Sequence, residues 1–175
     1  MSFPETFTTV ASRLCNSCGL CCNGVIFHTV RLQPKDSAPE LVALGLKLKR
    51  KKGQDYILQP CPAYRDAKCS IYEQRPQRCR LFKCQQLRRL ERGEITEPMA
   101  LEKIQDVQRL ATRMDELSRR ADGTMRKGPL TKRCETALAE PFDATDHHEL
   151  VAEREELAVA LGELDTILDE HFRVT

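Results

Sequence analysis

The chain has 175 residues, a formal net charge of +2, 31% charged and 5% aromatic residues, no tryptophan and nine cysteines. It has no run of about 18 apolar residues, as a membrane span requires, and its first residues lack the basic head and apolar stretch of a secretion signal. These features predict a soluble, cytoplasmic protein without a membrane partner, whose thiols are kept reduced. The odd cysteine total also argues against a framework of disulfides.

The first cysteine cluster is the stretch "LCNSCGLCCNG", which contains Cys15, Cys18, Cys21 and Cys22. A C-x-x-C turn brings two sulfurs within reach of one metal, and Gly19 permits the positive φ that such a turn needs. Cys22 directly follows Cys21, and neighbouring side chains diverge. We therefore expect Cys22 to bind a second metal or to bridge two sites.

The region between the two cysteine groups has the pattern of short elements. We expect a strand over 25–32, a helix from the cap Ser37 through Leu44, and a hairpin in "LKLKRKKGQDYILQ" that turns at Lys52-Gly53. Further on, Ser70 and Glu73 form a capping box for a short helix that should stop before Pro76. Another helix is expected through Leu81, Leu87 and Leu90 to Gly93.

The second cysteine group, in "CPAYRDAKCSIYEQRPQRCRLFKC", contains Cys61, Cys69, Cys79 and Cys84. Five residues along a helix correspond to a rotation of about 140°, so Cys79 and Cys84 cannot share one face of an unbroken helix. We expect one of them at a helix end, or the two at different metals.

A count of thiols suggests two sites of four. One site would take Cys15, Cys18, Cys21 and the proline-followed Cys61, which matches the C-x-x-C-x-x-C…C-P pattern of bacterial iron–sulfur proteins. Cys22, Cys69, Cys79 and Cys84 would form the other. The same eight thiolates could hold two tetrahedral zinc ions, although the triple repeat and the Cys-Pro pair favour 4Fe–4S clusters.

Buried thiolates need positive charge beside them. Four basic residues interleave with the second cysteine group and could supply it: Arg75, Arg78, Arg80 and Lys83. His28, in the predicted strand, is either an auxiliary ligand or a structural residue.

The two cysteine groups together resemble the YkgJ-type cysteine-cluster family, the bacterial CxxCxxCC zinc- or iron-chelating domain. The resemblance rests on "CNSCGLCC", Cys61-Pro62, Cys69 with Ile71-Tyr72, Arg75-Pro76, and the final "CRLFKC" element. It covers roughly residues 13–92 and fills all eight cysteine positions of the family pattern. It implies a metal ligand role for these eight cysteines. The domain also occurs in flagellin lysine N-methylases, which are much longer chains, so the resemblance does not imply methyltransferase activity here.

The second half of the chain is acidic and helical in pattern, whereas the first half is basic. Apolar residues spaced three or four apart predict helices near 98–121 and 146–172, with Asp146 and Glu149 as a capping box for the second. These should pair as an α-hairpin, a surface that also offers a site for a protein partner. Cys134 lies in the loop-like stretch "RKGPLTKRCE" and is expected outside the metal site.

The sequence thus predicts a mainly α protein in two parts. Residues 1–93 should form a small, irregular, metal-stabilised cysteine-rich domain with at most a short sheet, and residues 94–175 a helical tail. The metal ligands are Cys15, Cys18, Cys21, Cys22, Cys61, Cys69, Cys79 and Cys84, which hold an iron–sulfur cluster or zinc.

Two other functions stay open at this point. The basic first half could make the chain a nucleic-acid-binding zinc module, but it lacks the aromatic platform of single-strand binders, which disfavours nucleic acid as a partner. A thiol-redox or methyl-transfer-related enzyme is the other alternative. No phosphate loop or hydrolase motif is present, so the sequence assigns no catalytic residue and leaves enzymatic activity open.

Overall fold

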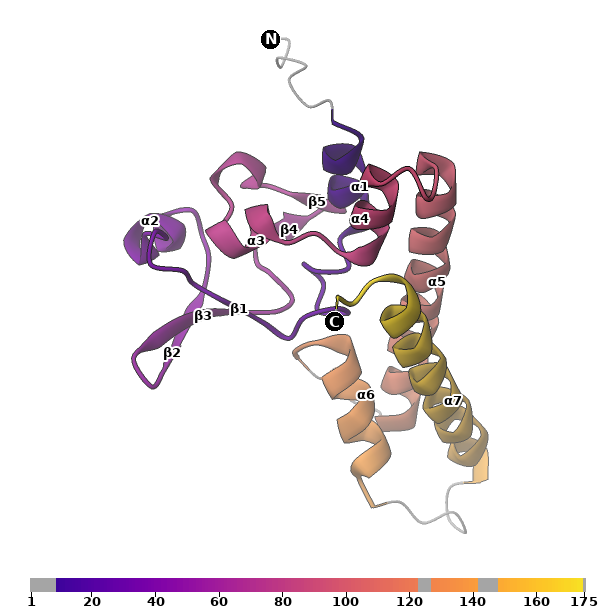
Figure 1. Ribbon diagram of the computed structural model, residues 1–175. Helices are drawn as coiled ribbons and strands as arrows, with labels where there is room; N and C mark the ends of the chain where they lie inside the picture. Colours follow the sequence, from indigo (N-terminus) through magenta and orange to yellow (C-terminus); the bar gives the residue numbers. More distant parts are fainter. Residues whose placement is uncertain (1–8, 123–126, 142–147, 175) are drawn as a thin grey trace.

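The computed structural model describes residues 9–122, 127–141 and 148–174. Helices make up most of this part of the chain, and a small antiparallel sheet lies to one side of them (Figure 1). The helices are α1 (Val10–Cys18), α2 (Ala38–Ala43), α3 (Gln77–Leu81), α4 (Gln85–Glu91), α5 (Glu97–Asp122), α6 (Leu130–Ala139) and α7 (His148–His171). The predicted fold class, mainly α with a short sheet, is confirmed.

Helix α1 contains the first two cysteines, at a place where the sequence predicted a turn. The Thr9 side chain accepts a hydrogen bond from the Ser12 backbone N–H and so caps the start of the helix. Gly19 ends it in the left-handed conformation, with φ of 66°, as the sequence predicted. Cys15 and Cys18 therefore lie near the helix end, and Cys21 and Cys22 lie in the turn that follows.

The sheet has the strand order β1-β3-β2, with β1 at Thr29–Arg31, β2 at Leu48–Lys51 and β3 at Gln54–Leu58. The predicted hairpin is confirmed: Lys52 and Gly53 form its turn with φ of 51° and 75°, the positive values that a two-residue hairpin turn requires. The predicted strand over 25–32 is shorter than expected, because Val25 packs among the helices and not in the sheet. A second ladder pairs β4 (Tyr64–Arg65) with β5 (Lys68–Cys69).

The predicted short helices are partly confirmed. Ser37 caps α2 by accepting a hydrogen bond from the Glu40 N–H. Ser70 does not act as a cap, because its hydroxyl donates to the Ala63 carbonyl at 3.0 Å, and only a 3₁₀ turn (Tyr72–Gln74) forms after it. That turn ends before Pro76, as predicted.

The helix predicted through Leu81 to Gly93 is in fact two helices. The chain becomes extended at Phe82, with φ of −71° and ψ of 128°, and α4 starts only after Cys84. Cys79 therefore lies within α3 and Cys84 at the N-cap of α4. This agrees with the expectation that one of the two cysteines sits at a helix end.

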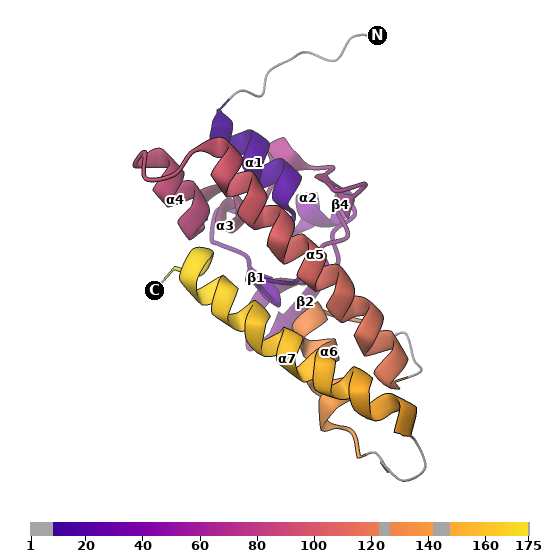
Figure 2. The same ribbon diagram turned by 90° about the vertical axis from the view of Figure 1, so that its right-hand side faces the viewer.

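The tail contains the two long helices that the sequence predicted, α5 and α7, packed antiparallel along each other (Figure 2). It also contains α6, which the sequence analysis missed. Cys134 lies in this helix and not in a loop, and its side chain is fully buried. The predicted capping residue Asp146 falls outside the described residues.

Two hydrophobic clusters stabilise this arrangement. The larger one joins α5, α6 and α7 to residues of the first half, among them Leu14, Leu20 and Leu87. The smaller one lies under the sheet and includes Leu41, Ile57 and partly buried Cys61, Cys69 and Cys79. The cysteine-rich segments are thus packed between the two clusters. Among the described helices, none combines the length and the apolar character that crossing a membrane demands.

Candidate metal centre

All eight cysteines of the predicted site line a single cavity of about 370 Å³, which we call the thiol cavity. They reach it from separate elements. Helix α1 and its following turn contribute the first four, and Cys61, β5, α3 and the start of α4 contribute the others. All eight are free thiols of intermediate burial, whereas Cys134 is buried elsewhere, in the larger hydrophobic cluster.

The first thiol group consists of Cys15, Cys18, Cys21 and Cys84. We assign each cysteine to a group by the neighbouring cysteines whose charge raises its pKa. Burial raises the pKa of Cys18 to about 12, and the charges of Cys84 and Cys15 add to this. Burial likewise raises the pKa of Cys21 well above its ordinary value, with Cys18, Cys15 and Cys84 as its strongest neighbours. The charges of the other members thus act on Cys18, Cys21 and Cys84, whereas Cys15 is also reached by the charge of Cys69.

The second thiol group consists of Cys22, Cys61, Cys69 and Cys79. Burial raises the pKa of Cys22, and its strongest neighbours are Cys61, Cys69 and Cys79. Burial also raises the pKa of Cys79 to about 12, again with Cys61 and Cys69 as neighbours. The two groups adjoin, because Cys15 also acts on Cys22.

This grouping differs from the partition that the cysteine count suggested. In that partition Cys61 belonged with Cys15, Cys18 and Cys21, and Cys84 belonged with Cys22, Cys69 and Cys79. The Cys61 N–H donates a 2.7 Å hydrogen bond to the Cys22 carbonyl, which ties Cys61 to the second group. Cys84 and Leu87, which lie at the start of α4, both pack against the larger cluster, to which Leu14 of α1 also belongs. Both contacts are long-range and leave no trace in the spacing of the cysteines.

Arg75 is the cation that acts most directly on the thiols. Burial raises the pKa of Cys15, while the charge of Arg75 and its hydrogen bond to the thiol oppose that rise. Arg75 also opposes the rise in the pKa of Cys79, which burial dominates. Because Cys15 and Cys79 belong to different thiol groups, Arg75 places positive charge beside both.

The other three basic residues predicted for this role are placed differently. Arg78 lines the thiol cavity. Lys83 is exposed and forms an ion pair with Glu91 at 2.7 Å, and Arg80 is exposed outside the cavity lining. Arg75 and Arg78 therefore border the cavity, whereas Lys83 and Arg80 do not, and of these four residues only Arg75 acts on the pKa of cavity thiols.

Tyr64 was not identified from the sequence, although it lies inside the cysteine-rich stretch "CPAYRDAKC". Its ring lines the cavity, and burial followed by the charges of Cys22 and Cys18 raises its pKa. Its hydroxyl approaches Gly19 so closely that a Cβ at that position would overlap it. Tyr64 is thus reached by the charge of one member of each thiol group.

Phe27 and Phe82 form an aromatic wall of the cavity. Their rings meet edge to face, with centroids 4.7 Å apart, and both line the cavity. Gln59 lines it as well, with 5% of the residue exposed. Its Oε1 is buried and has no hydrogen-bond partner among the described residues.

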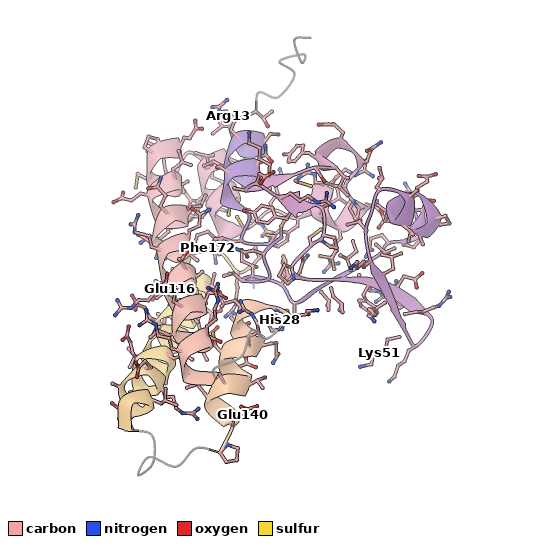
Figure 3. The ribbon with its side chains drawn as sticks, turned by 180° about the vertical axis from the view of Figure 1, so that it is seen from behind. Arg13, His28, Lys51, Glu116, Glu140 and Phe172 are labelled. Carbon is pink, nitrogen blue, oxygen red and sulfur yellow. The ribbon has the colours of Figure 1, made fainter. Side chains whose placement is uncertain are left out.

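His28 has a structural contact. Its Nε2 lies 2.7 Å from Thr131 Oγ1 on α6, and the residue is not part of the cavity lining. Figure 3 shows His28 at the side of the cysteine-rich region that faces α6. The contact links the two halves of the chain and makes the structural alternative for His28 the better supported one.

The residues that line the cavity fit a bound metal. Burial raises the pKa of seven of these thiols, so a metal would have to replace their protons: Cys15, Cys18, Cys21, Cys22, Cys61, Cys79 and Cys84. Yet among the described residues, no three Cys, His, Asp or Glu side chains stand close enough together to bind one metal ion as they are placed. The cavity is lined by thiols, the ligands that both iron–sulfur clusters and zinc take.

A comparison with protein families agrees with this chemistry. Residues 14–112, more than half of the chain, match the model of the CxxCxxCC family, described as a "Putative zinc- or iron-chelating domain". No curated protein and no solved structure matches the chain. The matched segment includes all eight cysteines of the thiol cavity together with helix α4 and part of α5. The chain therefore belongs to the CxxCxxCC family of metal-chelating domains.

Proposed function

We propose that the protein binds two iron–sulfur clusters through its eight cavity-lining thiolates. The observation that carries this proposal is the gathering of all eight into one cavity from five separate segments of the chain. Cys15, Cys18, Cys21 and Cys84 would hold one cluster, and Cys22, Cys61, Cys69 and Cys79 the other. When bound, such clusters supply one-electron redox chemistry or a structural cross-link.

The repeat of Cys15, Cys18 and Cys21 at every third position supports clusters over zinc. A tetrahedral zinc ion with Zn–S bonds of about 2.3 Å holds its sulfurs only about 3.8 Å apart. A cluster holds its thiolates further apart, since iron and sulfide atoms stand between them. The eight thiols of the cavity are enough for two such clusters with four thiolates each.

The ionisation of the thiols supports ligation over thiol-redox catalysis. Reactive cysteines have lowered pKa values, because the thiolate is the nucleophile. Here burial raises the pKa of Cys21 and of its neighbour Cys22, so the vicinal pair would be protonated at neutral pH in the metal-free protein. Protonated thiols are poor nucleophiles, so the raised pKa values favour a role as metal ligands over a role in thiol-redox catalysis.

The remaining parts of the proposal follow from the same site. Residues 1–93 form the metal-binding domain and residues 94–175 its helical tail, which offers a surface for a protein partner. Free thiols at this density suit a reducing compartment such as the cytoplasm. Arg75 offsets the negative charge of the loaded site from one side.

Anaerobic purification followed by iron, sulfide and zinc analysis tests the proposal. We expect a brown protein with a broad visible absorption band and with iron and acid-labile sulfide in equal amounts. The same sample reduced with dithionite should give a paramagnetic resonance signal. A colourless protein with stoichiometric zinc and no sulfide would contradict the cluster assignment and leave a zinc site in its place.

A further inference from the structure

A second hollow borders the thiol cavity, and we call it the polar cleft. It has a volume of about 470 Å³ and is bounded by residues 31–34 at the end of β1, residues 36 and 38, the hairpin residues 53–55, and Arg78 on α3. Among the described side chains, Arg31 and Arg78 are the two that line both hollows. Helix α3 packs against β1, which brings these arginines to the boundary between the two.

The carboxylates of the cleft are already engaged. Asp36 accepts two backbone hydrogen bonds, from the N–H of Gln33 and from that of Gln77, both at 2.7 Å. Asp55 forms an ion pair with Arg50 at 3.9 Å. The side chain of Gln54 donates to the carbonyls of Leu32 and Asp55, at 2.9 and 3.4 Å. These contacts fix the walls of the cleft, and both carboxylates, Asp36 and Asp55, already have partners.

The two arginines, by contrast, are uncommitted. Across residues 9–122, 127–141 and 148–174, neither the Arg31 nor the Arg78 guanidinium forms an ion pair or a side-chain hydrogen bond, and both are exposed. An arginine presents a planar fork of donors that matches the oxygens of phosphate and carboxylate groups. Two such forks on one cleft with no internal acid to satisfy them are an arrangement suited to an anion.

We propose that the polar cleft binds the oxyanion group of a small molecule, a phosphate or a carboxylate, between Arg31 and Arg78. The ligand would enter from the side of the hairpin, whose exposed Lys51 marks the outer end of that face (Figure 3). Because both arginines also line the thiol cavity, the rest of the bound molecule lies at the mouth of that cavity. The cleft thus provides a place for a small anionic molecule beside the metal centre.

A competing explanation is that Arg31 and Arg78 only offset the charge of the thiolates. That role predicts loss of metal when either arginine is replaced, and no saturable binding of anions. The oxyanion site predicts the reverse, loss of anion binding with metal content unchanged. The two explanations therefore differ in two independent readouts.

The test uses the full-length protein, as purified, in a chloride buffer of low ionic strength, because salt screens exposed charges. Inorganic phosphate and tricarballylate are titrated separately by isothermal calorimetry, to distinguish a phosphate from a carboxylate ligand. We expect saturable binding of at least one of them. In Arg31→Gln and in Arg78→Gln, binding should weaken about tenfold or more, the effect of losing one charge-assisted hydrogen bond. Arg80→Gln is the matched control, since Arg80 is exposed on α3 and borders neither hollow.

Saturable binding lost in both cleft variants but kept in Arg80→Gln, with unchanged metal content, supports the site. Failure of both probes to bind overturns it, as does equal weakening in all three variants. Metal analysis of the same samples separates this proposal from the preceding one. A protein without iron that still binds phosphate through Arg31 and Arg78 would contradict the cluster and leave the oxyanion site standing.

Discussion

Arg75 lies over the ring of Tyr72, with its guanidinium carbon 3.5 Å from the ring centroid, and its Nε donates a 2.7 Å hydrogen bond to the Tyr72 carbonyl. The stacking and the hydrogen bond fix the side chain in a position from which its charge reaches Cys15 and Cys79. The arginine is thus held in place before any metal binds, and it does not have to be ordered by the metal.

Replacing Arg75 should weaken metal retention. We expect Arg75→Gln to lower metal affinity about 10- to 100-fold, as loss of a supporting contact commonly does. Arg75→Lys should recover only part of this, since an ammonium keeps the charge but lacks the planar fork. Competition against a chromophoric chelator measures the affinity. Arg80→Gln serves as control, and an equal loss in that variant would show that the effect is one of general surface charge.

Serine substitutions should separate the two thiol groups. Cys18→Ser and Cys84→Ser remove ligands of the first group, whereas Cys61→Ser and Cys79→Ser remove ligands of the second. Each single change should lower the iron content by about half if each group binds one cluster with four thiolates. The double variant Cys18→Ser/Cys84→Ser should lose no more than either single one, while Cys18→Ser/Cys79→Ser should lose nearly all.

Cys134→Ala is the control for this series, because Cys134 is buried among apolar side chains away from the cavity. It should leave the metal content unchanged and reduce only stability. If the double variant Cys18→Ser/Cys61→Ser loses no more iron than either single variant, Cys18 and Cys61 bind the same cluster, and the partition by cysteine count is the correct one.

Gly19 should tolerate no side chain. An alanine there must adopt a positive φ, which costs about 1–2 kcal/mol, and its Cβ would also collide with the Tyr64 ring. Gly45→Ala isolates the first effect, since Gly45 has φ of 88° and nothing lies within 4 Å of a Cβ placed there. Urea unfolding of the loaded proteins should show a clearly larger loss for Gly19→Ala. Equal losses would mean that Tyr64 moves aside without cost.

Alkaline pH should destabilise the metal-free, reduced protein. Burial raises the pKa of Cys18 and that of Cys79 from an ordinary 9.0 to about 12 in the folded chain. As pH rises, the thiols of the unfolded chain therefore lose their protons before those of the folded chain. The stability that the protonated thiols contribute is complete below pH 9 and is lost as pH rises through 12. Each thiol should lower the free energy of unfolding by about 1.4 kcal/mol per pH unit in that interval.

Urea denaturation of the metal-free protein at several pH values above 9 measures this slope. Cys18→Ser/Cys79→Ser removes two of the titrating groups and should flatten it. Cys134→Ala removes only one, because burial also raises the pKa of Cys134, and should flatten the slope less. A slope that is the same in the double variant and in the unaltered protein would contradict the buried placement of these thiols.

Local signals allowed part of this fold to be predicted. Lys52-Gly53 predicted the hairpin turn, Ser37 predicted the start of α2, and Pro76 predicted the end of the turn before α3. These predictions were possible because each residue acts on the backbone of its immediate neighbours. Helix α6 was missed since Gly128-Pro129 masked it, although Leu130, Cys134 and Ala137 have helical spacing and are buried on one side.

The eight cysteines that line the cavity were predictable as a set, whereas the grouping proposed here rests on contacts that their spacing does not reveal. Cys84 joins Cys18 only because the chain breaks at Phe82 and α4 then packs against the tail. Arg31 had no distinguishing pattern at all, since its role depends on where α3 comes to lie. Contacts of this kind arise from tertiary packing and cannot be read from spacing.

The end of α7 is attached to the start of α4, and this matters for how the protein is made. The Gln85 N–H donates to the Phe172 carbonyl at 3.1 Å, and Gln86 Nε2 donates to the His171 carbonyl at 3.1 Å. Cys84 is the N-cap residue of that same helix. During synthesis all eight cavity cysteines leave the ribosome well before residues 171 and 172, so the nascent chain should hold an incomplete first thiol group until these two residues have emerged. We therefore expect chains stopped at residue 168 to acquire less metal than released chains that contain residues 171 and 172, with the second thiol group loaded first, which pulse-labelling with radioactive iron on stalled ribosomes can measure.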